Sequence, residues 1–93
     1  MNKEEARELL ARRLAELRLI PFQGLLRYIG NPEVTEWVGQ SGKRYQIETE
    51  AFWDDKRGED LRVQVAIDDG GLGALKPMTD DFIKSADDRF VGE

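Results

Sequence analysis

The 93-residue chain contains no cysteine and no histidine. The absence of histidine excludes Ser–His–Asp and Cys–His catalysis and a haem held by histidine. The absence of both residue types excludes the usual zinc sites, and the absence of cysteine excludes iron–sulfur clusters and a disulfide-stapled secreted scaffold. We therefore predict no cofactor, no metal and no catalytic residue. At this length, we expect residues 1–93 to form one domain with one modest core.

The chain also lacks any apolar run of 18 residues, which a membrane-spanning helix requires. Its first five residues carry charges and have no apolar stretch of the kind found in signal peptides. We therefore expect a soluble, cytoplasmic protein that does not bind membranes.

Charge is distributed unevenly. Residues 1–47 carry eight basic and six acidic side chains, a net charge of +2, whereas residues 48–93 carry six basic and thirteen acidic side chains, a net charge of −7. Nucleic-acid binding requires clustered lysine and arginine, so we expect no nucleic-acid partner. An acidic half would suit a basic protein partner, or would serve only solubility.

Residues 3–20 have the periodicity of an amphipathic helix with one buried face. Apolar side chains recur at steps of four, four and three residues: Ala6, Leu10, Leu14 and Leu17. Asn2 is suited to cap the N-terminus of this helix, and Pro21 ends it.

From residue 33 the apolar period changes to two, which is typical of strands. We predict strands over about 34–39, 43–54, 61–68 and 72–76, followed by a helical turn over 80–84 capped by Thr79. The predicted fold class is α+β, with an N-terminal amphipathic helix packed on a three- to four-stranded antiparallel β-meander and a short C-terminal helical turn.

The two best alternating runs indicate their own register. Ile47 opposite Ile67 and Trp53 opposite Leu61 place both apolar sets on one face, and a slip of one residue would put half of them in water. The register of the first hairpin stays open, and with it the face that Trp37 occupies.

The sheet face turned away from the helix is the candidate interaction surface. Its predicted members are Trp37, Arg44, Glu48, Glu50, Phe52, Arg62 and Gln64. Aromatic and arginine side chains are the types that anchor interfaces, although ordinary cross-strand pairs explain them equally well. In the predicted register Arg62 lies beside Phe52, where a cation–π contact can form.

Adjacent aspartates occur four times: Asp54-Asp55, Asp68-Asp69, Asp80-Asp81 and Asp87-Asp88. Such carboxylates could bind a divalent cation or act as an acid–base couple. The first two pairs fall at opposite ends of the predicted second hairpin, more than about 20 Å apart, and none has EF-hand spacing. We therefore interpret the aspartates mainly as turn residues.

Residues 37–93, about two thirds of the chain, resemble a family of small bacterial α+β domains of unknown function. The motifs that carry the resemblance are Trp37-Val38-Gly39, Tyr45-Gln46-Ile47-Glu48, Trp53-Asp54-Asp55, Leu61-Arg62-Val63, Ile67-Asp68-Asp69-Gly70-Gly71, Pro77-Met78-Thr79-Asp80-Asp81-Phe82-Ile83 and Phe90-Val91-Gly92-Glu93. An aromatic residue often follows Gly-Gly in that family, where this chain has Leu72. The resemblance implies a shared fold and brings no activity, substrate or catalytic residue.

The sequence thus predicts a small non-catalytic protein-binding domain, for example an immunity- or antitoxin-like protein directed at a basic partner. The alternative is a divalent-metal or small-ligand-binding module, or an enzyme that uses acidic residues. A homodimer formed through the outer face or an edge strand also stays open.

Overall fold

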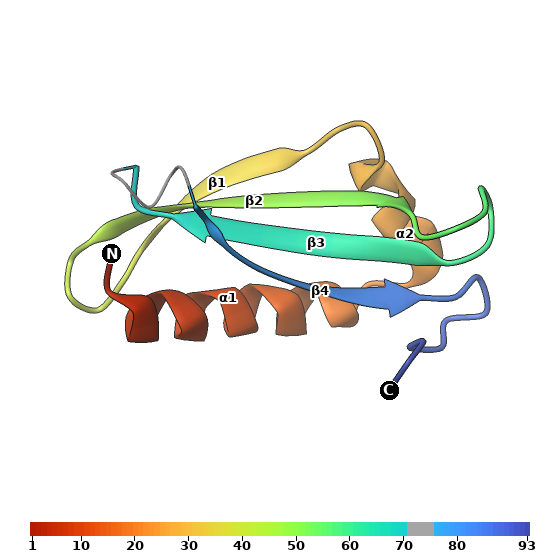
Figure 1. Cartoon of the computed structure of the whole chain (residues 1–93), viewed down its shortest axis with the longest axis horizontal. Coiled ribbons are helices and arrows are strands. Elements are labelled where there is room, and N and C mark those ends of the chain that lie inside the picture. Colours follow the sequence, from red (N-terminus) through yellow and green to blue (C-terminus); the bar gives the residue numbers. More distant parts are fainter. Residues whose placement is uncertain (71–75) are drawn as a thin grey trace.

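A computed structural model describes residues 1–70 and 76–93, which form two layers, a long helix and an antiparallel sheet (Figure 1). The elements are α1 (Lys3–Arg18), α2 (Phe22–Leu25), the 3-10 helix η1 (Leu26–Tyr28), β1 (Glu33–Val38), β2 (Arg44–Trp53), β3 (Leu61–Asp68) and β4 (Met78–Lys84). The strands lie in the sheet in the order β1-β2-β3-β4. The predicted α+β class, with an N-terminal helix on an antiparallel meander, is confirmed.

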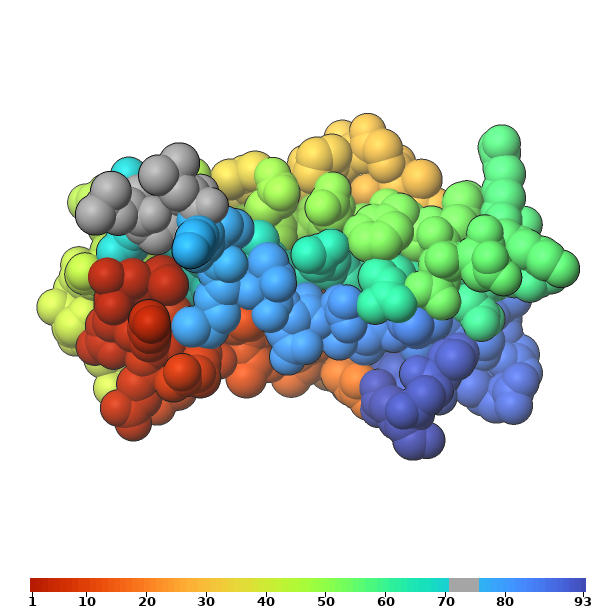
Figure 2. Space-filling model, in the orientation of Figure 1, coloured from red at the N-terminus to blue at the C-terminus, as the bar shows by residue number. Residues whose placement is uncertain are grey.

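Helix α1 begins at the predicted residue and ends two residues before the predicted end at residue 20. The Asn2 side chain accepts a hydrogen bond from the Glu5 backbone N–H at 3.1 Å, as an N-cap does. At the other end, the N–H groups of Leu19 and Ile20 donate to carbonyls three residues back, a tighter turn that ends the helix before Pro21. The helix is visible along the lower edge of the molecule in Figure 2, below the strands.

The register of β2 and β3 agrees with the prediction. Ile47 lies opposite Ile67, and Trp53 lies opposite Leu61. The inner face of this pair packs against α1, α2 and η1 in one core. Its buried apolar members are Ala6, Leu9, Leu10, Leu14, Leu17, Phe22, Leu25, Tyr28, Tyr45, Ile47, Ala51, Leu61, Val63, Val65, Ile67 and Phe82.

The predicted helical turn over 80–84 is wrong, because these residues belong to β4. Phe82 lies opposite Val63 in the neighbouring strand and is buried. The Thr-Asp-Asp sequence has the local features of a helix start, but pairing with β3 satisfies the backbone groups of that strand and buries Phe82. The predicted strand over 72–76 lies outside the described residues, except for Lys76, which is in a bend.

The C-terminal residues partly close the free edge of β4. Phe90 forms an antiparallel bridge with Lys84, and the Val91 N–H donates to the Ile83 carbonyl at 2.9 Å. Earlier in the strand, the Asp80 side chain accepts a hydrogen bond from the Asp81 N–H at 2.8 Å. Both arrangements occupy backbone groups that an edge strand otherwise exposes.

A partly buried arginine joins the helix to the sheet. The Arg13 guanidinium donates to Thr49 Oγ1 at 3.2 Å, to the Tyr28 hydroxyl at 3.3 Å and to Glu33 at 3.0 Å. Thr49 and Tyr28 are almost completely buried. The guanidinium thus satisfies hydroxyl groups that water does not reach.

A buried lysine holds the other end of α1. Lys84 Nζ donates to the Ile20 carbonyl at 2.9 Å and to the Arg18 carbonyl at 3.4 Å. These carbonyls lie at the C-terminal end of the helix, where a cation is favoured by the helix dipole.

Candidate interaction surface

The outer face of the sheet, which is the face opposite the helices, is formed by alternate residues of all four strands. These residues are Val34, Glu36, Val38, Arg44, Gln46, Glu48, Glu50, Phe52, Arg62, Gln64, Ala66, Asp68, Thr79, Asp81 and Ile83. In the described parts of the chain, the helices lie on the other side of the sheet (Figure 1). Within the part of the chain that the structure describes, the outer face is therefore the broad sheet surface without a helix over it.

Six of the seven predicted surface residues lie on this face, and Trp37 does not. The register of β1 and β2 places Trp37 opposite Tyr45, on the inner face. There it packs against the core, with the Arg12 guanidinium 4.4 Å from the centre of its ring. Its inclusion in the surface was wrong, because the sequence left the register of the first hairpin open.

Arg62 is held by two carboxylates. Its guanidinium donates to Asp54 at 3.0 and 2.6 Å and to Asp81 at 2.8 Å. These hydrogen bonds, first those to Asp54, raise the pKa of Arg62. The predicted cation–π contact with Phe52 does not occur among the ring contacts of residues 1–70 and 76–93.

The ion pairs divide the outer face into a compensated part and a negative part. Arg62 offsets Asp54 and Asp81, and Arg44 lies 3.2 Å from Glu36. Within residues 1–70 and 76–93, no such ion pair forms at the remaining carboxylates of this face, which are Glu48, Glu50 and Asp68. We call these three residues the uncompensated acids.

Apolar side chains are exposed at two places on the outer face. Val34 and Val38 on the edge strand β1 are 57% and 59% exposed, and Phe52 near the end of β2 is 39% exposed. The face thus combines separate apolar contacts with an excess of negative charge, a combination that suits a polar protein interface better than an apolar ligand.

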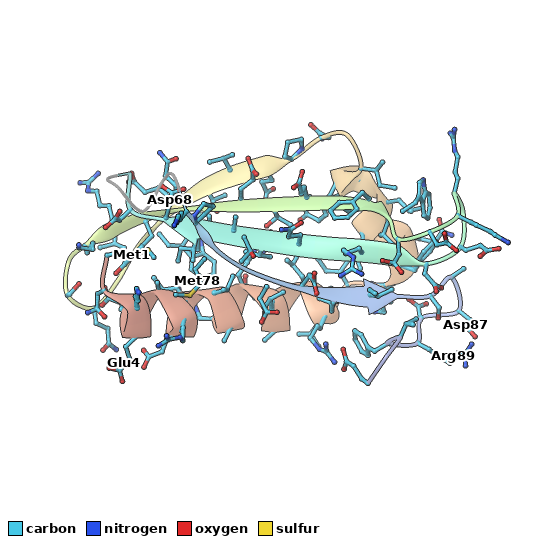
Figure 3. The ribbon with its side chains drawn as sticks, viewed as in Figure 1. Met1, Glu4, Asp68, Met78, Asp87 and Arg89 are labelled. Carbon is cyan, nitrogen blue, oxygen red and sulfur yellow. The ribbon has the colours of Figure 1, made fainter. Side chains whose placement is uncertain are left out.

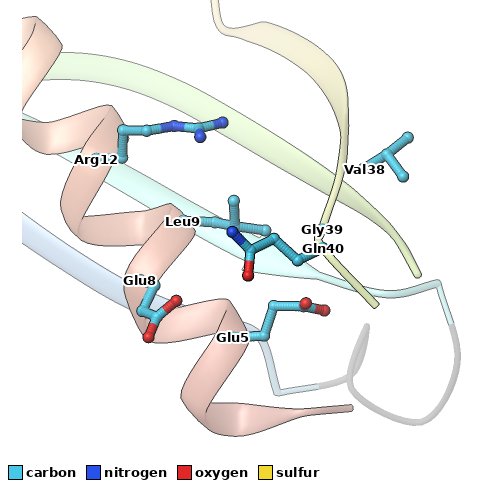
Figure 4. A pocket seen from close by; sticks show the side chains of 7 residues that line it. All are labelled: Glu5, Glu8, Leu9, Arg12, Val38, Gly39 and Gln40. Carbon is cyan, nitrogen blue, oxygen red and sulfur yellow. The ribbon is translucent and has the colours of Figure 1, made fainter. Parts of the chain in front are cut away.

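The first hairpin and α1 enclose a hollow of about 230 Å³, lined by Glu5, Glu8, Leu9, Arg12, Val38, Gly39 and Gln40 (Figure 4). Glu5 is already engaged there, since its carboxylate accepts hydrogen bonds from Ser41 N–H at 3.0 Å, Ser41 Oγ at 2.7 Å and the Tyr45 hydroxyl at 2.9 Å. The bonds from Ser41 lower the pKa of Glu5. Burial, followed by the bond to Glu5, raises the pKa of Tyr45 to about 12.

A side chain at position 39 would collide with this arrangement. A Cβ atom on Gly39 would overlap the Glu5 carboxyl group. The close approach of hairpin and carboxylate therefore requires glycine. We interpret the contacts of Glu5 in this hollow as structural bonds between the helix and the hairpin rather than as parts of a binding site.

Asp54 and Asp81 meet at Arg62, but the four aspartate pairs do not gather into one site. Asp68 and Asp87 lie towards opposite ends of the molecule (Figure 3). Within residues 1–70 and 76–93, no three acidic side chains are grouped so that they could hold a metal ion. Asp68 accepts from Gly70 N–H at 2.8 Å, as a turn residue does, whereas Asp88 accepts from the distant Phe22 N–H at 2.6 Å and caps α2.

The arrangement defines a small α+β domain with an acidic sheet face that, among residues 1–70 and 76–93, carries no helix. Comparison with known proteins found no matching family model, no matching curated protein and no matching solved structure. The resemblance of residues 37–93 to a family of bacterial domains therefore stays a prediction. None of the described helices has both the length and the apolar character needed to cross a bilayer.

Proposed function

We propose that the protein is a non-catalytic, cytoplasmic binding domain that docks a basic protein on its outer face. The observation that carries the proposal is the negative part of that face, where Glu48, Glu50 and Asp68 lack cation partners among the described residues. An immunity- or antitoxin-like protein that blocks a basic partner is one form of this function.

Electrostatics favours a basic partner over a second copy of the chain. The net charge of the protein is −5, so two copies repel each other at long range, whereas a basic protein is attracted to the uncompensated acids. Phe52 and the two exposed valines supply apolar contact area around the charges.

The alternatives of a metal-binding module and an acid-residue enzyme have less support. Carboxylate catalysis needs a cleft that perturbs a pKa, and the outer face is an open sheet surface. The carboxylates of Glu5 and Asp54 are already engaged in contacts that join parts of the chain to one another.

The proposal is tested by site-specific crosslinking. A photoreactive phenylalanine analogue is placed at Phe52 and, as the control, at Leu19, which is 85% exposed at the end of α1. A protein captured from a lysate of the source organism at position 52 only is then produced in pure form. Its binding to the unlabelled domain is measured by calorimetry at about 50 mM and about 300 mM salt.

We expect a basic protein whose affinity falls as salt rises, because screening weakens exposed charge pairs. The variant Glu50→Lys should weaken binding at least about tenfold, since it replaces an attractive charge by a repulsive one. An acidic partner, a salt-independent affinity or the same capture at position 19 would contradict the proposal.

A further inference from the structure

We propose that a hollow on the outer face, beside Ala66, receives one lysine or arginine side chain of the partner. This inference rests on the proposed function and names a contact within it. The hollow has a volume of about 230 Å³ and is lined by Val34, Gln46, Glu48, Ala66, Asp68 and Pro77.

The pairing of three strands forms the hollow. Val34 in β1 lies opposite Glu48 in β2, which lies opposite Ala66 in β3. Asp68 follows two residues after Ala66 on the same face. Because alanine is the smallest side chain in this row, its neighbours stand higher than it does and form the walls of a depression.

The lining matches both parts of a long basic side chain. Val34, Ala66 and Pro77 offer apolar contact for an aliphatic stem, which basic residues readily lay along apolar surface. Glu48 and Asp68 are two of the uncompensated acids, and the described contacts of Asp68 use one oxygen, which accepts from Gly70 N–H. The carboxylates therefore keep acceptor positions for an incoming ammonium or guanidinium group.

The protein holds one of its own arginines in the same manner. Arg62 lies on the outer face between Asp54 and Asp81, which belong to separate segments of the chain. Glu48 and Asp68 are likewise contributed by neighbouring strands, but neither forms an ion pair with a cation among the described residues. The hollow thus offers a pair of carboxylates comparable to the one that Arg62 already occupies.

The size of the hollow favours a single side chain over a free ligand. The hollow has a volume of about 230 Å³. Pockets for drug-sized ligands are about 300–1,000 Å³ and bury most of the ligand. A side chain needs less enclosure, because the remainder of its own protein covers the mouth of the hollow.

The experiment is a titration of the ¹⁵N-labelled protein, followed by amide chemical shifts. The probes are Nα-acetyl-arginine amide and its neutral isostere Nα-acetyl-citrulline amide. We expect the arginine probe to shift the amides of Val34, Glu48 and Ala66 in a saturable way at millimolar concentration, and the citrulline probe to bind at least tenfold more weakly.

Two variants and one control locate the binding. Glu48→Gln removes one carboxylate, and Ala66→Leu fills the hollow, so each should weaken binding of the arginine probe at least about fivefold. Glu59→Gln makes the same change in net charge in the exposed loop between β2 and β3, and it should leave the titration unchanged. The amide spectrum of each variant also shows whether the fold is kept.

The outcomes separate this inference from the proposed function. Equal binding of both probes, or equal weakening by Glu48→Gln and Glu59→Gln, would overturn the hollow as the receptor. If the crosslinked basic partner then still bound in a salt-dependent way, the proposed function would stand without this contact. If that partner also failed to shift the amide signals of residues on the outer face, both proposals would be refuted.

Discussion

Replacing Arg13 by methionine tests whether the arginine between helix and sheet stabilises the fold through its hydrogen bonds. Methionine keeps much of the apolar stem and removes the guanidinium donors. The Thr49 and Tyr28 hydroxyls would lose their partner while 1% and 2% exposed. A buried polar group left without a partner costs about 1–3 kcal/mol, so we expect Arg13→Met to lower the free energy of unfolding by about 2–4 kcal/mol.

This loss is large beside the roughly 5–15 kcal/mol by which small domains are stable. With a urea m-value of about 1–3 kcal/mol/M, it should lower the midpoint of urea unfolding, followed by circular dichroism, by roughly 1–3 M. Arg12→Met is the control, because Arg12 stacks on Trp37 from an exposed position and should cost only about 0.5–1 kcal/mol.

A double-mutant cycle assigns the effect to the hydroxyl. In the Thr49→Val background no hydroxyl is left unpaired at that position, so Arg13→Met should cost about 1 kcal/mol less than in the natural chain. A cost of Arg13→Met below about 1 kcal/mol, or the same cost in both backgrounds, would refute the reasoning.

Three further predictions concern the contacts that hold α1 to the sheet. Burial raises the pKa of Tyr45 to about 12 in the folded protein, against about 10 in the unfolded chain, so we expect its contribution to stability to be complete below pH 10 and to be lost as pH rises towards 12. Ultraviolet titration of a Tyr28→Phe variant, in which Tyr45 is the remaining tyrosine, should show this late transition, and ionisation near 10 would contradict it. The hydrogen bonds from Ser41 lower the pKa of Glu5, so the contribution of Glu5 to stability is present above its usual pKa of 4.5 and is lost as pH falls through the lower pKa of the folded protein. Glu5→Gln should therefore flatten the acid side of the stability–pH profile measured by urea unfolding. An unchanged slope would contradict this prediction. Lys84→Met removes the charged donor to the Ile20 carbonyl and should lower the free energy of unfolding, measured by thermal unfolding, by about 2 kcal/mol. A change below about 0.5 kcal/mol would show that this hydrogen bond does not stabilise the fold.

Sequence patterns predicted those helices and strands in which one face is apolar and the other is polar. In β2 and β3, apolar and polar residues alternate with few exceptions, so one register alone buries Ile47 against Ile67. In β4, Phe82 follows two aspartates, and the strand structure depends on pairing with β3, a long-range interaction that local preference does not report.

The sequence predicted which residues share the outer face of the sheet, but not which of their charges form ion pairs. Alternation alone placed Glu48, Phe52 and Arg62 on one face. The partners of Arg62 could not be read from the sequence, because Asp81 reaches it from a strand that local signals had assigned to a helix. Likewise, Arg13 shows no distinguishing pattern in the helix, and only packing reveals that its charge is partly buried.

The occupied edge of β4 has a consequence for assembly. Among the described residues, the Val91 bond and the Asp80 side chain occupy backbone groups on that edge, while no strand pairs with the outer edge of β1. Growth of a β-fibril requires two free edges on each subunit, because every copy must bind one neighbour on each side. Because the C-terminal residues occupy only part of the β4 edge, we expect strand pairing between copies to favour the edge of β1, and the C-terminal residues to lower the tendency of the sheet to polymerise.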